Sequence, residues 1–190
     1  MFDDAALGRL REMLARHVSI AIDAPDLRRA CVLIPLIRSA GGWSLLLTRR
    51  AENLASHSGQ IAFPGGGVEA GESLQDAAIR EAEEEVGIPA AHIELIGRLD
   101  DLITNSGYLV APFIGVVDEP VDYVIQSSEV VEAFEVPVDA LLDPKKPEVR
   151  YVTFRNRKYP AYSYSYEQYD IWGLTGRMLK SFLDMVWLAV

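Results

Sequence analysis

The stretch Pro64-Gly65-Gly66-Gly67, followed at once by a glutamate-rich segment, is the feature that most limits how this chain can fold. Proline has a fixed φ and no amide hydrogen, and successive glycines weaken helices and strands, so we expect a turn here. Because glycine has no Cβ, the backbone of such a turn can approach a bound ligand closely. The fold must therefore bring a glycine turn to the start of whatever element follows it.

The segment from Glu72 to Val86 is the strongest helix prediction in the chain. Ser73 is a suitable N-cap, and Gly87, with a proline two residues further on, ends the periodic pattern. The sequence therefore predicts a helix that begins directly after the glycine turn.

Three glutamates of this helix, Glu81, Glu84 and Glu85, have spacings of i, i+3 and i+4. Each helical residue advances by about 100°, so the three carboxylates share one arc of about 100°, and Glu83 lies away from them. Neighbouring like charges destabilise a helix by a few tenths of a kcal/mol per pair, and a hard divalent cation removes that repulsion. With no histidine or cysteine beside them, these oxygen ligands suit Mg²⁺ or Mn²⁺ rather than zinc. The alternative is a charged outer face exposed to solvent.

The other segments predict strands around this helix and a second long helix near the C-terminus. Alternating or dense apolar runs predict strands, and apolar residues spaced by three or four predict helices. We expect helices over 4–18 and 172–188, a hairpin of strands 30–37 and 43–48, and strands over 93–99, 108–117, 129–136, 150–154 and 161–166, with Pro112 interrupting its strand. This pattern indicates an α+β fold, a mixed sheet flanked by helices, in a single domain over 1–190 with an N-terminal helical extension over about 1–24.

The charge of the chain excludes some classes of function. Lysine and arginine total 18 against 28 aspartates and glutamates, a formal net charge of −10. Such a chain repels nucleic acids and anionic membranes, yet it can bind phosphates if a metal ion supplies the positive charge. The single cysteine, Cys31, lies in an apolar run and is expected to be a buried hydrophobic residue. With no signal peptide or membrane span recognisable, we expect a cytoplasmic protein.

A longer pattern contains the glycines and glutamates together. Gly66 is followed by five residues, Glu72, seven residues, and then Arg80-Glu81-Ala82-x-Glu84-Glu85-x-Gly87-Ile88. This segment, residues 66–88, resembles the signature box of the Nudix hydrolases. The resemblance implies an α/β/α sandwich and metal-assisted hydrolysis of a nucleoside diphosphate linked to another group, in which the cation polarises a phosphoryl oxygen and lowers the pKa of the attacking water.

The same resemblance implies roles for particular residues. Glu81, Glu84 and Glu85 would hold Mg²⁺ or Mn²⁺, and the backbone carbonyl of Gly65 would join them. Glu72 and Arg80 would pair, two turns apart, and hold the glycine loop against the helix. The general base is either a helix glutamate or Glu129, which follows two serines at a predicted strand start; the alternative for Glu129 is an ordinary surface position.

Two further segments narrow the resemblance. Residues 46–51 with 59–66 are similar to the upstream signature of the coenzyme A pyrophosphatase branch, and Tyr169-Asp170-Ile171-Trp172-Gly173-Leu174-Thr175 is similar to its tail. The implied substrate is coenzyme A or acyl-coenzyme A, giving 3′,5′-ADP and 4′-phosphopantetheine. One position departs from the signature: Ala55 stands where it has an arginine.

The expected substrate-binding residues are Arg49, Arg50, His57 and Gly66. The departure at Ala55 leaves ADP-ribose, a dinucleotide or a nucleoside triphosphate open as substrates. A third hypothesis for the function is that the chain is a non-enzymatic module that senses a nucleotide. The late aromatic residues, from Tyr159 to Trp172, could stack on adenine or line a pantetheine groove, or divide between the core and an intersubunit surface. The apolar residues 186–190 suggest a contact in a homodimer.

Overall fold

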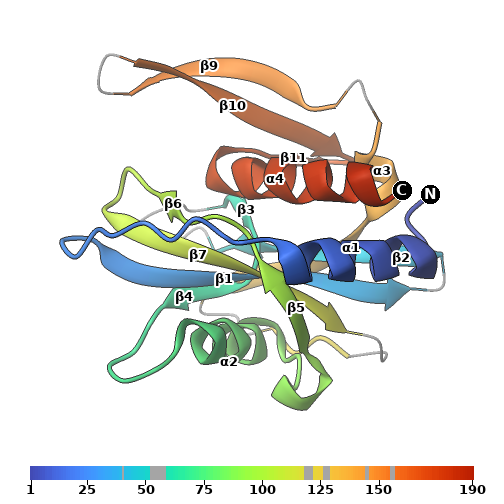
Figure 1. Cartoon of the computed structure of the whole chain (residues 1–190), viewed down its shortest axis with the longest axis horizontal. Coiled ribbons are helices and arrows are strands. Elements are labelled where there is room, and N and C mark those ends of the chain that lie inside the picture. The colour runs from blue at the N-terminus through green and yellow to red at the C-terminus, as the bar shows by residue number, and fades with distance from the viewer. Residues whose placement is uncertain (40, 52–58, 118–121, 126–128, 144–145, 155–156) are drawn as a thin grey trace.

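The computed structural model describes residues 1–39, 41–51, 59–117, 122–125, 129–143, 146–154 and 157–190, with the side chains of residues 154 and 157 excepted. A mixed β-sheet forms the middle layer, with helix α2 on one face and helices α1 and α4 on the other (Figure 1). The expected α+β fold of a mixed sheet flanked by helices is therefore confirmed. The elements are α1 (Asp4–Arg16), β1 (Arg28–Ser39), β2 (Gly42–Arg50), β3 (Ile61–Ala62), β4 (Gly65–Gly67), α2 (Leu74–Val86), a 3₁₀ turn (Ala90–His92), β5 (Glu94–Arg98), β6 (Leu102–Ile103), β7 (Tyr108–Val117), β8 (Val130–Pro137), α3 (Val138–Leu141), β9 (Glu148–Phe154), β10 (Arg157–Tyr166), β11 (Tyr169–Ile171) and α4 (Gly173–Ala189).

Strand β1 organises the sheet. It pairs with β2 in the predicted antiparallel hairpin and with β7 in parallel along ten residues. Strands β5 and β6 pair with β7, and β8 pairs with the outer side of β2. A second, three-stranded sheet in the order β11-β10-β9 lies over α4, with the β9–β10 hairpin at the top of Figure 1.

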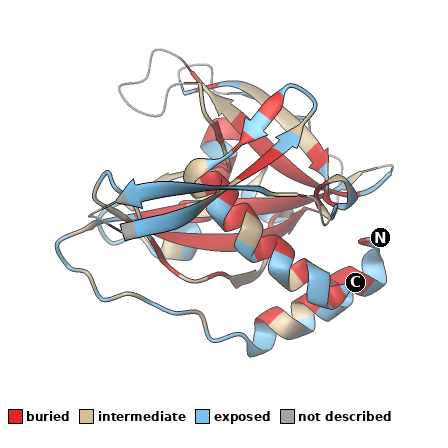
Figure 2. Cartoon of the chain, turned by 90° about the horizontal axis from the view of Figure 1, so that it is seen from above, coloured by how far each residue is buried: buried red, intermediate tan, exposed pale blue. Residues whose placement is uncertain are grey.

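Two hydrophobic cores fill the two spaces between sheet and helices, which is why β1 and β7 are apolar on both faces. Leu33 and Leu46 pack on the α2 side, whereas Ile34 and Leu45 pack on the side of α1 and α4. Figure 2 shows the buried residues concentrated in the sheet and on the inner faces of the helices.

The helix α2 begins and ends as the sequence predicts. The Ser73 hydroxyl accepts a hydrogen bond from the amide of Asp76 at 3.1 Å, and Gly87 adopts the left-handed conformation with a φ of 74°. The residues of α2 that face the sheet are mostly small alanines, Ala77, Ala78 and Ala82, all fully buried. Their size lets the helix backbone lie close to β1, which brings the polar residues of α2 near the glycine segment.

Two local predictions were wrong. The glycines Gly65–Gly67 form a short strand, not a turn, because β1 supplies the pairing that glycine's low strand propensity does not. At Gly65 this pairing is so close that a Cβ would lie 2.4 Å from the carbonyl oxygen of Cys31. Pro112 does not interrupt β7, because β6 and β5 pair with the residues on either side of it and need no amide hydrogen there.

The N-terminal helix is part of the main core. Leu10 of α1 is fully buried, and α1 packs against α4 and β5. At the other end of the chain, Thr175 of α4 donates a buried hydrogen bond of 2.9 Å to the carbonyl of Ile61. Trp187 and Leu188 are exposed in the single chain, so their expected role in a dimer stays a prediction. Among the described residues, every helix is too short or too polar to cross a membrane.

Candidate active site

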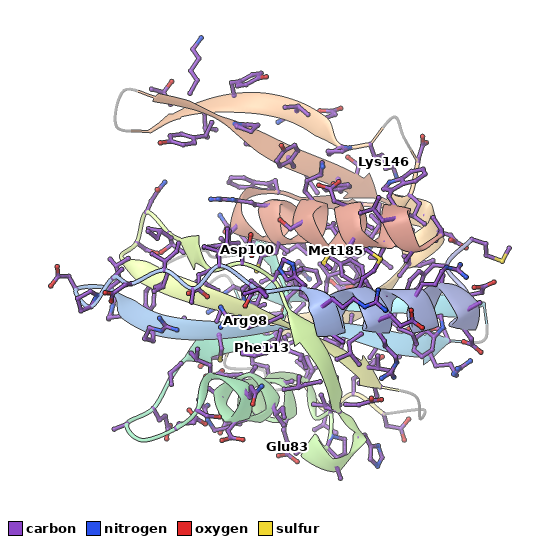
Figure 3. The ribbon with its side chains drawn as sticks, viewed as in Figure 1. Glu83, Arg98, Asp100, Phe113, Lys146 and Met185 are labelled. Atoms are coloured by element: carbon purple, nitrogen blue, oxygen red, sulfur yellow. The ribbon has the colours of Figure 1, made fainter. Side chains whose placement is uncertain are left out.

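The three glutamates of α2 lie in very different environments. The side chain of Glu84 is 58% exposed, that of Glu81 is 14% exposed and that of Glu85 only 5%. Glu83 lies on the outer side of the helix, pointing away from the sheet (Figure 3). The shared arc thus runs from solvent into the space between α2 and the sheet, and the most deeply placed carboxylate is Glu85.

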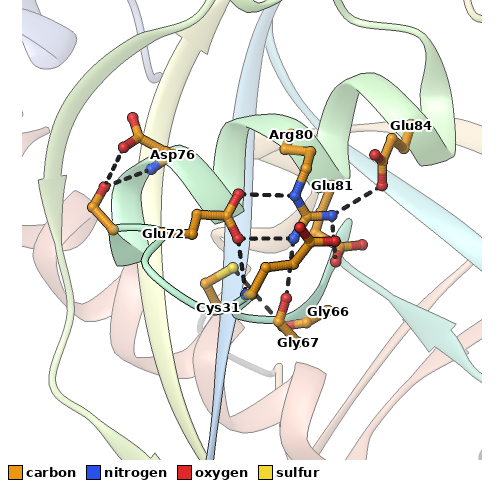
Figure 4. A network of polar contacts seen from close by, with 10 residues as sticks. Cys31, Gly66, Gly67, Glu72, Asp76, Arg80, Glu81 and Glu84 are labelled. Carbon is orange, nitrogen blue, oxygen red and sulfur yellow. Dashed lines mark hydrogen bonds and ion pairs between the residues drawn. The ribbon is translucent and has the colours of Figure 1, made fainter.

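Arg80 is the centre of a network of ion pairs (Figure 4). Its guanidinium donates two hydrogen bonds to Glu72, at 2.8 and 3.1 Å, and one to the carbonyl of Gly67 at 3.0 Å. The same side chain donates to Glu81 at 3.0 Å and to Glu84 at 2.9 Å. The pairing lowers the pKa of Glu72 and raises that of Arg80. The expected contact between Glu72 and Arg80 is present, and it joins the glycine strand to α2.

Glu85 is a buried carboxylate with incomplete partners. One oxygen accepts a hydrogen bond from the amide of Gly65 at 3.2 Å, and the other has no hydrogen-bond partner among the described residues. Arg50 approaches that second oxygen to 3.7 Å. Burial raises the pKa of Glu85 to about 7, although the Gly65 amide and Arg50 oppose this shift. At the deepest point of the site, one buried carboxylate oxygen of Glu85 is therefore left with an ion-pair neighbour, Arg50, but no hydrogen bond among the described residues.

Glu81 depends on the absence of a side chain at Gly66. A Cβ on Gly66 would lie 2.3 Å from one carboxylate oxygen of Glu81, so any residue larger than glycine would displace the carboxylate. Burial raises the pKa of Glu81 against the pairing with Arg80, and the nearby charges of Glu84 and Glu129 add to the rise. The glycine strand and the glutamates thus form one cradle.

This cradle has the chemistry of a site for a hard divalent cation. Its donors are oxygens, two of its carboxylates are disfavoured as anions by burial, and one buried oxygen of Glu85 lacks a hydrogen bond. In the part of the chain that the structure describes, no three acidic, histidine or cysteine side chains converge as a preformed metal cluster. Figure 4 shows that Glu81 and Glu84 are instead paired with Arg80.

The two arginines predicted to bind substrate point to different neighbours. Arg50 faces Glu85, whereas Arg49, across a β-bulge, pairs with Glu132 on β8 at 3.0 Å. The Nε of Arg50 is buried and has no hydrogen-bond partner among the described residues. Arg50 is therefore beside the carboxylates, and Arg49 belongs to a separate polar group with Glu132 and Tyr169 that the sequence analysis did not anticipate.

The other predicted residues can be placed only in part. Glu129 is exposed at the start of β8, and its carbonyl accepts a hydrogen bond from the amide of Ala51 at 2.8 Å. Its charge contributes to the raised pKa of both Glu81 and Glu85, so it shares their electrostatic environment. His57 and Ala55 lie outside the described residues. Cys31 is fully buried, as predicted, and burial raises its pKa to about 11.

Comparison with known proteins shows the family to which this chain belongs. The NUDIX domain profile matches residues 27–156, more than half of the chain. A Photorhabdus laumondii protein named as the uncharacterized Nudix hydrolase NudL is 38% identical over 160 residues, covering 84% of this chain and 85% of that protein. A Yersinia pestis protein of the same name is 39% identical over 160 residues, covering 84% of this chain and 80% of its own length.

Solved structures agree with this placement. The Nudix hydrolase RenU from M. smegmatis superposes with a TM-score of 0.52 at 25% identity, covering 60% of this chain and 73% of that one. The Ap4A hydrolase of C. elegans, in a binary complex, shares the fold with a TM-score of 0.51 at 22% identity, covering 58% of this chain and 80% of that one. The chain belongs to the Nudix family. It is a Nudix hydrolase, with the pyrophosphatase activity that this class carries out using divalent metal ions.

Proposed function

We propose that this enzyme hydrolyses the pyrophosphate bond of coenzyme A or acyl-coenzyme A and releases 3′,5′-ADP and 4′-phosphopantetheine. The observation that carries the chemistry is the cradle of Gly65, Gly66, Glu81 and Glu85, with its buried and incompletely partnered carboxylate oxygen. The substrate class rests on the similarity of residues 46–51, 59–66 and 169–175 to the coenzyme A pyrophosphatase branch. The relatives named NudL are consistent with that branch but carry no stated substrate.

Glu81, Glu84 and Glu85 are the residues that would hold Mg²⁺ or Mn²⁺, with the backbone of Gly65 beside them. When bound, the cation supplies neutralisation of the diphosphate and lowers the pKa of water. This role accounts for how a chain of net charge −10 accepts a polyanionic substrate.

The side chains of the protein then have separate tasks. The amide of Gly65 fixes the orientation of the Glu85 carboxylate. Arg50, whose buried Nε lacks a partner among the described residues, is positioned to donate to a phosphoryl oxygen beside Glu85. Arg80 orients Glu81 and Glu84 and keeps the glycine strand against α2. Glu129 is exposed and shares the field of the buried glutamates, which suits a general base that takes a proton from the attacking water.

ADP-ribose is the second candidate substrate, because Ala55 replaces the arginine of the coenzyme A signature. Both candidates contain an adenosine 5′-diphosphate group, so the proposed chemistry at the cradle is the same. The two substrates differ in the group attached to the adenosine diphosphate, so the residues that contact that group determine which substrate the enzyme prefers.

The test is a substrate panel with two matched variants of α2. Purified protein with Mg²⁺ or Mn²⁺ is given coenzyme A, acyl-coenzyme A, ADP-ribose, NADH and nucleoside triphosphates, and the products are identified by mass. We expect Glu84→Gln to lower kcat by about a hundredfold or more because it removes a ligand charge, whereas Glu83→Gln, on the outer side of the same helix, retains activity. Normal turnover by Glu84→Gln would contradict the assignment of the cation site.

A further inference from the structure

A cavity of about 360 Å³ lies at the end of β2, beside the polar group of Arg49, Glu132 and Tyr169. The described residues that line it come from two distant parts of the chain: Arg49, Gln60 and Ile61 from β2 and the approach to β3, and Gln168, Asp170 and Trp172 from around β11. Its volume lies within the range typical of small-molecule sites. The reaction at the glutamate cradle, as described above, makes no use of it.

We propose that this cavity is the subsite for the adenine base of the substrate, a proposal that rests on the proposed function above. Adenine is a flat aromatic ring with an exocyclic amino donor and ring nitrogen acceptors. A protein recognises such a ring with an aromatic face and with a few amide or carboxylate groups at its edge.

Trp172 supplies the aromatic face. Trp172 as a residue is 51% exposed although it borders the cavity, which leaves it accessible to a base that stacks on the indole ring. The other aromatic residue of the cavity, Tyr169, is fixed in place. Its ring stacks on Phe134 with centroids 3.7 Å apart, and its hydroxyl donates to Glu132 at 2.6 Å. The cavity thus combines one rigid aromatic wall with one accessible aromatic face.

The polar residues complement the edge of adenine. The lining includes Gln168, whose amide group can donate and accept, and Asp170, whose carboxylate can accept from an amino group. One oxygen of Asp170 accepts a hydrogen bond from Ser163, which orients the carboxylate. A pantetheine arm is flexible and has no flat face, so it would leave the exposed indole of Trp172 without a partner. The lining therefore favours the base over the arm.

The position of the cavity relative to the cradle is also suitable. Arg49 lines the cavity, and the next residue, Arg50, approaches Glu85 to 3.7 Å. On the other side, Gln60 and Ile61 lie a few residues before Gly65, whose amide binds Glu85. Both walls of the cavity are thus continuous along the backbone with residues that contact Glu85 of the cradle.

The experiment measures binding of adenosine 3′,5′-bisphosphate, which has no pyrophosphate bond to hydrolyse, to the full chain in the presence of Mg²⁺, by calorimetry and by tryptophan fluorescence. We expect the nucleotide to quench the fluorescence of Trp172. Trp172→Phe should remove the quenching and retain the affinity, whereas Trp172→Ala should weaken the affinity by about fivefold to a hundredfold, the usual effect of losing one base–aromatic stack. Trp187→Phe is the matched control, an exposed tryptophan of α4 outside the cavity, and should change neither measurement.

Two results would overturn the subsite. One is a nucleotide affinity unchanged in Trp172→Ala and in Gln168→Ala. The other is that 4′-phosphopantetheine, not the nucleotide, depends on Trp172. The exposed Gln168 provides a second variant that does not disturb the start of α4. The two proposals can fail separately. If the subsite is wrong, the variants bind the nucleotide normally while the wild-type chain still hydrolyses coenzyme A. If the proposed function is wrong, the wild-type chain does not hydrolyse coenzyme A.

Discussion

The buried carboxylate of Glu85 gives the sharpest prediction. Burial raises its pKa to about 7, compared with a value of 4.5 for a freely exposed glutamate. Between these two pH values the unfolded chain releases the proton while the folded chain keeps it, so the free energy of unfolding falls as the pH rises. A pKa raised from 4.5 to about 7 corresponds to about 3 kcal/mol of lost stability, and the full loss is present above pH ~7.

Replacing Glu85 with glutamine removes this titration and keeps the shape of the protonated side chain. Without divalent metal, we expect Glu85→Gln to be more stable than the wild type by up to about 3 kcal/mol at pH ~8 and to match it below pH ~4.5. The assay is urea denaturation in the presence of a chelator across this pH range, with Glu83→Gln as the exposed control on the same helix. Added Mg²⁺ should stabilise the wild type at high pH more than it stabilises Glu85→Gln, which lacks one of the three ligand charges. A difference between the two proteins that did not vary with pH would refute the reasoning.

Three other predictions follow from single contacts or positions. Gly66→Ala should weaken Mg²⁺ binding by about tenfold to a hundredfold, because the added Cβ would meet the Glu81 carboxylate. Gly67→Ala, which has open space around the added Cβ, should bind Mg²⁺ normally. Isothermal titration of both variants with Mg²⁺ measures the difference. Leu10→Ala should lower the free energy of unfolding by about 2–5 kcal/mol in a single transition, since α1 belongs to the main core, and a separate early transition would argue against one domain. Ala55→Arg should raise kcat/KM for coenzyme A by about tenfold, through a charge-assisted hydrogen bond to phosphate, and should raise kcat/KM for ADP-ribose less. Equal gains for the two substrates would show that residue 55 does not distinguish coenzyme A from ADP-ribose.

The sequence predicts those helices and strands that are specified by residues close together in the chain. The N-cap Ser73 and the terminal Gly87 fixed the bounds of α2 to within two residues, and the spacing of its glutamates placed them on one arc. The strand of β7 was predicted over the same residues that the structure shows, with an incorrect interruption at Pro112. These features depend on propensity, capping and periodicity, which act within a few residues.

What the sequence could not predict depends on tertiary contacts. Gly65–Gly67 form a strand only because β1 pairs with them. The depth of Glu85 follows from the approach of Arg50 and the glycine strand, and its helical position does not distinguish it from the exposed Glu84. The divergence of Arg49 and Arg50 follows from the alternation of side chains along β2, but the sequence predicts a strand that ends at residue 48, before both arginines.

The ion pairs of Arg80 have a consequence for the order in which ligands assemble. In the unliganded chain the guanidinium already balances Glu81 and Glu84, so those carboxylates offer little unpaired negative charge to a solitary cation. A nucleotide arriving as its magnesium complex provides phosphate oxygens that can take over part of the arginine's pairing. Assembly would then be cooperative, with the free enzyme holding metal loosely and the ternary complex holding it firmly.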